Sequence, residues 1–180
     1  MTDLHDTGPS PAIQRILEER ARALARPLMV EPAGERLDLA VLTIGGECYG
    51  VDIQHMQEIR SLSALTPVPG APPIWAGVMN LRGNLYPILN MRRYLALPED
   101  SPVEGGVVVL VAATGLTVGL LADDMREVRQ VPRAEIAPPL ASAAGARRAI
   151  VLGVTADWIT VLDVEALVAD PRLVVQEEIR

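Results

Sequence analysis

The chain has 180 residues, of which 49% are hydrophobic and 22% are charged, which suffices for one compact domain or two small merged ones without a disulfide or structural metal. Its 16 basic residues face 23 acidic residues, and the net charge of -7 argues against a general binder of nucleic acids or anionic membranes. All the basic residues are arginine, so a Walker-type phosphate loop and Schiff-base chemistry, which both need lysine, are excluded.

The N-terminal sequence and the apolar runs bear on localisation. The first ten residues lack the basic and apolar segments of a secretory signal, and the longest apolar run, Val107–Ala113, is far shorter than a membrane-spanning helix. A single cysteine allows no internal disulfide, which fits a reducing compartment. We therefore expect a soluble, cytoplasmic protein.

Residues 1–36 are expected to form a tail, an amphipathic helix and a linker before a main domain at 37–170, with 171–180 as a C-terminal tail. Ser10 and Pro11 are typical of a helix start, and apolar residues then recur at three- and four-residue spacing as far as about Arg26. This apolar stripe has to be buried against the main domain, a second copy or a partner. We favour the main domain, because a single helix of this length is marginal alone.

From Leu37 onward, short apolar runs between turn residues predict a mostly β body, followed by a short C-terminal helix. Pairs of turn residues that contain glycine favour tight hairpins, because glycine tolerates a positive φ angle. The segment 66–73 cannot lie inside a ladder, since four of its eight residues are proline. The predicted hairpins join Leu37–Ile44 to Glu47–Ile53 through Gly45–Gly46, Ala76–Leu81 to Leu85–Leu89 through Arg82–Asn84, Val107–Ala113 to Leu116–Ala122 through Thr114–Gly115, and Ala149–Val154 to Trp158–Leu162 through Ala156–Asp157.

The body contains a weak internal duplication. The two halves align at an offset of 69 residues, which drifts to 76 and then 73 as loop lengths change. Two related small barrels around one shared core would give this pattern, and such a duplicate leaves a groove between its copies where a partner can bind. The pairs at the first offset are Gly50 with Gly119, Met56 with Met125, Glu58 with Glu127, and Ile59 with Val128.

Side chains that carry chemistry are sparse. His55 and Cys48 are the only histidine and cysteine of the body, so no zinc or iron ligand set exists, and no G-x-S-x-G motif occurs. The acidic pair Asp123–Asp124 follows an apolar strand, where a solvated turn is the ordinary explanation. The glycine pairs lack the strand-then-helix context of a phosphate site, and the tryptophans and tyrosines are too scattered to stack bases. The sequence thus indicates a non-catalytic binding module without a cofactor.

Several segments together resemble the CheW family of chemotaxis coupling proteins. The resemblance extends over about Leu37–Asp170, and the NLRG segment followed by a proline and an apolar strand is specific in combination with the others. The matching segments are YGVDIQHMQEIR (Tyr49–Arg60), TPVPGAPPIWAGVMNLRGNLYPILNMR (Thr66–Arg92), VGLLADDMREV (Val118–Val128), Ile150–Val154 and Ile159–Leu167.

The resemblance implies a non-catalytic adaptor made of two intertwined five-stranded small barrels, similar to Src-homology barrels, around one shared core. It would join the cytoplasmic tip of a methyl-accepting chemoreceptor to the regulatory domain of a CheA-type histidine kinase. That regulatory domain itself resembles CheW, so the two can alternate in rings, and other CheW-like copies are further candidate partners. The protein would be cytoplasmic and held at membrane receptor arrays by its partners, with no cofactor, nucleic acid or membrane insertion.

The resemblance also implies a receptor groove. An apolar face of a receptor hairpin would lie between the barrels, where methionines can repack, glycines permit close approach, and an arginine can hydrogen-bond a receptor carboxylate or carbonyl. Core packing is the plain alternative for the methionines, and a solvated position is the alternative for the charged residues. The groove residues carried over are Met56, Glu58, Gly77, Arg82, Met125 and Gly153.

One position departs from the family pattern, because Asn90 stands where many members carry aspartate, which leaves its role open. Two other functions remain open as well. A CheW-like scaffold could serve a non-chemotactic chemosensory pathway, such as pilus motility or development. A small-barrel enzyme or ligand binder would need a deep pocket with convergent polar groups.

Overall fold

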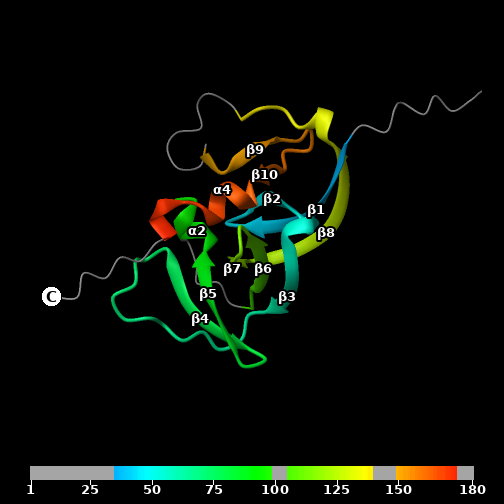
Figure 1. Cartoon of the computed structure of the whole chain (residues 1–180). Coiled ribbons are helices and arrows are strands. Elements are labelled where there is room, and N and C mark those ends of the chain that lie inside the picture. Colours follow the sequence, from blue (N-terminus) through cyan, green and yellow to red (C-terminus); the bar gives the residue numbers. More distant parts are fainter. Residues whose placement is uncertain (1–34, 99–104, 140–148, 174–180) are drawn as a thin grey trace, which may run out of the picture. The chain divides into compact units, whose positions relative to one another are not determined.

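The computed structural model describes residues 35–98, 105–139 and 149–173, all within one unit, Gly34–Arg180. It is mostly β and contains two five-stranded sheets, as predicted (Figure 1). The predicted N-terminal helix and residues 174–180 of the predicted C-terminal tail lie outside the described residues. Sheet A has the order β8 (Asp124–Pro132), β1 (Arg36–Ile44), β2 (Glu47–Asp52), β10 (Thr160–Leu162), β9 (Val151–Val154), and sheet B has the order β3 (Met56–Ser61), β6 (Val107–Ala113), β7 (Leu116–Ala122), β5 (Asn84–Asn90), β4 (Trp75–Leu81).

Short helices join these strands. Asn90 and Asp163 cap α2 and α4 in the same way, since each side chain accepts a hydrogen bond from the backbone N–H three residues ahead. α4 is the short C-terminal helix expected from the sequence. The helices are α2 (Met91–Tyr94) and α4 (Val164–Val168), and the 3-10 turns are η1 (Ile53–His55), η2 (Arg133–Glu135) and η3 (Pro171–Leu173).

The sequence duplication is present in the topology. Exchanging strands β1 to β5 with β6 to β10, in order, converts the strand order of sheet A into that of sheet B. Each sheet therefore takes two strands from one half of the chain and three from the other. The halves meet in two equivalent parallel pairs, β2 with β10 and β5 with β7. Equivalent bulges interrupt the pairings of β3 with β6 and of β8 with β1.

Three hairpins have two-residue turns, as predicted for Gly45–Gly46 and Thr114–Gly115. Both turn residues have positive φ in each case: 59° and 83° at Gly45–Gly46, 53° and 87° at Arg82–Gly83, and 52° and 82° at Thr114–Gly115. These angles match the right-handed twist of the flanking strands. The expected turn Arg82–Asn84 is one residue too long, because Asn84 already pairs with Leu81.

Two other strand predictions were wrong. The last hairpin has shorter strands and a longer connection than expected, because Thr155 hydrogen-bonds both backbone groups of Ile159. The Thr155 N–H donates to the Ile159 carbonyl (3.0 Å), and the Thr155 Oγ1 accepts from the Ile159 N–H (3.1 Å). The strands β3 and β8 were not predicted at all. Their bulges, at Gln57 and Arg126, break the alternation by which a half-buried strand is recognised.

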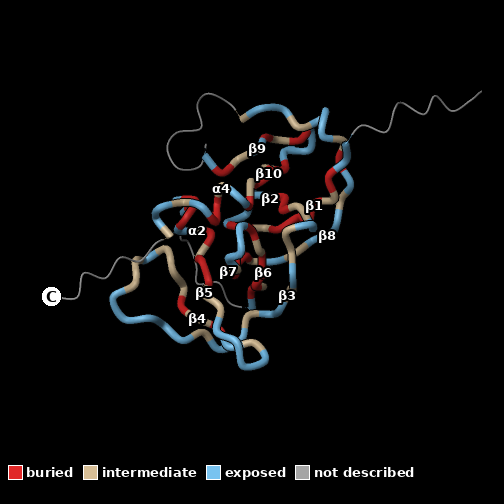
Figure 2. Tube along the Cα trace, in the orientation of Figure 1, coloured by how far each residue is buried: buried red, intermediate tan, exposed pale blue. Residues whose placement is uncertain are grey.

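The interior consists of one large shared core and one small core inside each barrel (Figure 2). On β6, Val108 and Leu110 point into the small core of sheet B, whereas Val109 and Val111 belong to the shared core. The shared core also receives residues from β1, β2, β5, β7 and β10 and from both α-helices. Strands covered on both faces read as continuous apolar runs, which explains the sequence of Val107–Ala113.

A half-buried ion pair links the two sheets. Arg92, on α2, contacts Asp123 through Nε (2.9 Å) and Nη2 (2.8 Å), and the other carboxylate oxygen accepts from the Gly45 N–H in the β1–β2 turn (2.7 Å). The Asp123 N–H donates to the Thr43 carbonyl (2.9 Å). The expectation of a solvated turn is therefore wrong for Asp123, whereas Asp124 is exposed.

A second polar cluster fastens η3 to α2. The Tyr94 hydroxyl donates to Asp170 (2.7 Å), and the Arg172 guanidinium pairs with the same carboxylate (2.7 Å) while stacking 4.3 Å from the centre of the Tyr94 ring. Hydrogen bonding from Arg172, helped by Tyr94 and opposed by burial, lowers the pKa of Asp170 to about 2. Burial and the bond to Asp170 raise the pKa of Tyr94.

The lowered pKa predicts how stability depends on pH. Asp170 is ionised above its unfolded pKa of about 4, and its contribution is lost as the pH falls toward about 2. Asp170→Asn should therefore cost about 2 kcal/mol at pH 7, and the gap from wild type should close between pH 4 and pH 2. Urea unfolding at several pH values measures this gap. The exposed-site control Glu135→Gln should show no such gap, and a gap for Asp170→Asn that is constant down to pH 2 would contradict the prediction.

Candidate functional site

The two candidate methionines occupy equivalent places. Met56 begins β3 and pairs with Val111, and Met125 lies near the start of β8 and pairs with Leu42. Both are half-buried and pack against the shared core. Each precedes a bulge residue, which re-aims the strand beyond it. The methionines therefore combine core packing with a partly accessible surface, on β3 and on β8.

Glu58 and Arg82 are brought together although they lie 24 residues apart. Arg82 is the first residue of the β4–β5 turn, and its Nη2 lies 3.4 Å from Oε1 of Glu58 on β3. Glu58 also pairs with Arg60, so one carboxylate is shared by two guanidinium groups. The Arg82 side chain remains 77% exposed. Its contact with Glu58 involves only Nη2, so most N–H donors of the guanidinium remain available to a partner.

The two candidate glycines are buried, and the chain itself makes the close approach to them. A Cβ atom at Gly77 would lie 2.5 Å from the Thr66 carbonyl oxygen, and one at Gly153 would meet the Ala137 carbonyl oxygen still more closely. In each case the next residue forms an isolated bridge, Thr66 with Val78 and Ala137 with Val154. Equivalent crossing segments thus explain both glycines without a receptor.

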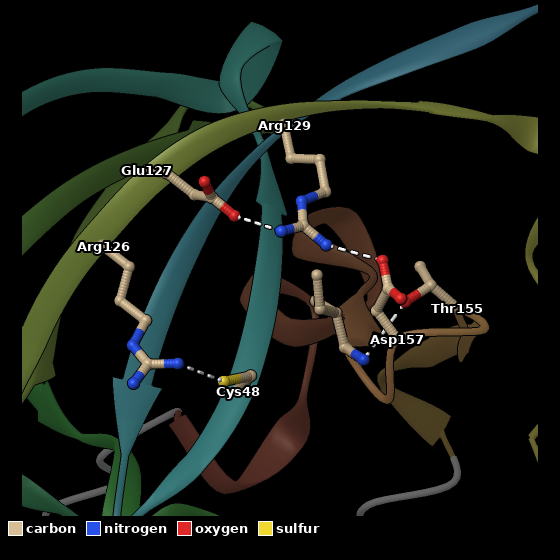
Figure 3. A network of polar contacts seen from close by, with 7 residues as sticks. Cys48, Arg126, Glu127, Arg129, Thr155 and Asp157 are labelled. Carbon is tan, nitrogen blue, oxygen red and sulfur yellow. Dashed lines mark hydrogen bonds and ion pairs between the residues drawn. The ribbon is translucent and has the colours of Figure 1, made fainter.

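Sheet A carries a counterpart of the Glu58 cluster that was not recognised from the sequence (Figure 3). Arg129 on β8 contacts Glu127 (2.5 Å) and Asp157 in the β9–β10 loop (2.6 Å). Here two carboxylates share one guanidinium, the reverse of the arrangement around Glu58. The signal was present, since the offset of 69 aligns the Glu58-x-Arg60 pattern with Glu127-x-Arg129.

Three of the cavities are lined by residues within the described part of the molecule. An apolar cavity of about 440 Å³ lies against β4, β5 and β7 and includes Gly77 and Trp75. One of about 680 Å³ lies beside the β9–β10 loop, and one of about 330 Å³ is lined by Cys48, Arg126 and the Arg129 cluster. Met56 and Met125 line none of these three cavities.

Groups that could hold a metal are absent from the described residues, where no three histidine, cysteine, aspartate or glutamate side chains cluster. His55 is half-buried, with Nδ1 3.4 Å from the Ala112 carbonyl oxygen, and Arg126 contacts Sγ of Cys48 at 3.5 Å. None of the helices within the described ranges is long and apolar enough to cross a membrane. The fold is a duplicated double barrel, and its candidate residues Met56, Met125, Glu58 and Arg82 are half-buried or exposed on β3, β8 and the β4–β5 turn.

Comparison with known proteins gives the family. The profile of the CheW-like domain family matches residues 38–172. The chain is 33% identical to the chemotaxis protein CheW of Klebsiella aerogenes over 108 residues, which cover 59% of this chain and 65% of that protein. It is 27% identical to the chemotaxis protein CheW of Treponema pallidum over 146 residues, 77% of this chain and 86% of that protein. The chain therefore belongs to the CheW-like domain family.

Two further comparisons extend this result. Protein FrzA of Myxococcus xanthus is 32% identical over 97 residues, 53% of this chain and 60% of that protein. The crystal structure of the scaffolding protein TtCheW from Thermoanaerobacter tengcongensis superposes with a TM-score of 0.68 at 22% identity, covering 77% of this chain and 96% of that one. At this identity the superposition establishes the shared fold, which agrees with the two barrels expected from the resemblance.

The crossing segments predict the effect of filling the buried glycines. Gly153→Ala should destabilise the fold by about 3 kcal/mol, because its Cβ would overlap a backbone carbonyl that cannot move aside. Gly83→Ala is the matched control: it has positive φ but open space, so it should cost only about 1 kcal/mol. Chemical unfolding measures both. Equal costs would mean that the crossing segment yields easily and that Gly153 is kept for another reason.

Proposed function

We propose that this protein is a non-catalytic adaptor that couples the cytoplasmic tip of a chemoreceptor to the regulatory domain of a CheA-type histidine kinase in chemotaxis. The match of a CheW-like domain to residues 38–172 carries the proposal. The relatives named CheW are chemotaxis proteins, and a solved structure of the same fold is a scaffolding protein. In this function the protein is cytoplasmic and is recruited to membrane receptor arrays by its partners.

The receptor surface in this proposal is centred on Glu58 and Arg82. A long apolar receptor hairpin would lie along the partly buried Met56 and Met125, whose flexible side chains adapt to helices of differing sequence. Arg82 would then offer its free guanidinium N–H groups to a receptor carboxylate or helix-end carbonyl. In this proposal Gly77 and Gly153 serve the fold rather than the receptor contact, because each closely approaches a crossing segment of the chain itself.

Coupling in this proposal is a free-energy difference between signalling states. A receptor conformation changes the kinase only if the adaptor binds one state more tightly, and such couplings are typically about 1–3 kcal/mol. No bond is made or broken by the adaptor. The rigid shared core suits this role, because a closely packed body transmits a displacement from one face to another.

Arg82→Ala should weaken binding of a receptor cytoplasmic fragment about tenfold, or about 1.4 kcal/mol, with an unchanged melting temperature, because the Arg82 side chain is 77% exposed. Arg133→Ala is the control, since Arg133 is an exposed arginine paired with Glu35 away from β3. Titration calorimetry with the same receptor fragment on Glu58→Gln and on the double variant Glu58→Gln/Arg82→Ala then tests whether Glu58 orients Arg82. An affinity unaffected by Arg82→Ala would remove that residue from the receptor surface.

Binding to the kinase has a separate test. Light scattering behind size exclusion should detect a one-to-one complex when the protein is mixed with the regulatory domain of the kinase encoded nearest to it. A folded monomer that forms no complex would mean that the family membership gives the fold while the partner has changed. Arg82→Ala should leave this complex intact, which separates the kinase contact from the receptor contact.

A second candidate function is scaffolding in a chemosensory pathway with another output, such as pilus motility or development. The similarity to Protein FrzA favours keeping it, since that relative is not named as a chemotaxis protein. The contacts would be of the same kind, with different receptors. The genes that neighbour this one, and the motility of a deletion strain, distinguish the two outputs.

A further inference from the structure

The β9–β10 loop holds a tryptophan in a conformation that ordinarily belongs to glycine. The Trp158 N–H donates to the Thr155 carbonyl (3.0 Å), and the Thr155 N–H donates to the Ile159 carbonyl (3.0 Å), so Ala156, Asp157 and Trp158 form a three-residue hairpin loop. The last residue of such a loop is left-handed, and Trp158 has a φ of 62°. A bulky residue there is strained, and strain of this kind is found where a side chain serves a function.

Packing does not account for Trp158, because its side chain is 78% exposed. The next largest exposures among large hydrophobic residues of the described chain are those of Leu85 and Leu116, which also lie at hairpin ends. Trp158 lines a cavity of about 680 Å³, which neither leucine lines. An exposed indole next to a cavity is the usual anchor of a protein contact, since tryptophan is enriched at interface hot spots.

The charge around this cavity is negative. The charged side chains that line it are Glu47 and Asp157, and no arginine is among its described lining residues. Arg129 contacts Asp157 and Glu127, and it lines the neighbouring cavity of about 330 Å³ together with Arg126, so the excess of negative charge is confined to the lining of the 680 Å³ cavity (Figure 3). Around Glu58 on sheet B the pairing is reversed, with two arginines on one carboxylate.

We infer that Trp158, Asp157 and Glu47 form a docking site for an arginine-bearing segment of a partner protein. A guanidinium stacks on the face of an indole and pairs with a carboxylate in the same plane, so an aromatic ring beside two acids is complementary to it. Binding of the partner compensates for the unfavourable free energy of the left-handed backbone at Trp158, and this is why a tryptophan is retained there. This surface belongs to the other barrel from Arg82, and it stands whether or not the receptor proposal does.

The probe is the peptide acetyl-Arg-Gly-Arg-Gly-Arg-amide, titrated into the full chain carrying Trp75→Phe, in which Trp158 is the only remaining tryptophan. Saturable quenching of Trp158 emission is expected. The same peptide with citrulline in place of arginine keeps the shape and loses the charge, and it should bind at least tenfold more weakly. Equal binding of the two peptides would overturn the inference.

Variants measured by calorimetry in the otherwise wild-type chain separate function from stability. Trp158→Gly should raise the melting temperature, because glycine relieves the left-handed φ, and should lower peptide affinity at least fivefold. Asp157→Asn should also weaken binding, whereas Glu135→Gln, which changes the net charge equally at an exposed position that does not line the cavity, should not. A lower melting temperature for Trp158→Gly, or an equal loss for Glu135→Gln, would overturn the proposal.

Two other occupants give distinct results. If the chain's own Arg147 and Arg148 fill the site, the variant Arg147→Gln/Arg148→Gln will bind the peptide more tightly than the wild type. If a second copy fills it, Trp158 emission will change with protein concentration alone. Either result would overturn a partner segment as the occupant.

Discussion

The large apolar core shared by the two sheets is the constraint on which the rest of the molecule depends. The strands β1, β6 and β7 are covered on both faces. Their side chains point alternately into the shared core and into the small core of a barrel. Neither barrel can close alone, because each takes strands from both halves of the chain. The strands β3 and β8 and their neighbouring turns are consequently held in a fixed relation to one another.

The duplication kept the framework and changed the charges. Bulges, parallel pairings, helix caps and crossing segments recur at equivalent places, whereas the Glu58 and Arg129 clusters have opposite excess charge. The Arg92–Asp123 pair has no counterpart, since the aligned positions are Glu165 and Gln54. The two barrels thus differ in the charged groups of these clusters, and electrostatic complementarity governs binding specificity more than affinity.

The sequence alone predicted much of the fold, and for physical reasons. The hairpin of Val107–Ala113 and Leu116–Ala122 was right to the residue, because a turn with positive φ separates two fully apolar strands. The strands β3 and β8 were not predicted, because their bulges and exposed charged residues interrupt the two-residue period of burial. Residues far apart in sequence, such as Glu58 and Arg82, meet only through barrel closure, so their grouping came from the resemblance and not from spacing.

The exchange of strands also orders the events of synthesis. In sheet B, the strand β3 waits for β6. In sheet A, the free edge of β2 is likewise paired by β10, so this sheet stays incomplete until residues 160–162 have left the ribosome. Until then β2 presents unpaired N–H and carbonyl groups, which is the form in which strands aggregate or pair with a second chain. The exchange of strands that joins both barrels in one body therefore makes the nascent chain dependent on β9 and β10.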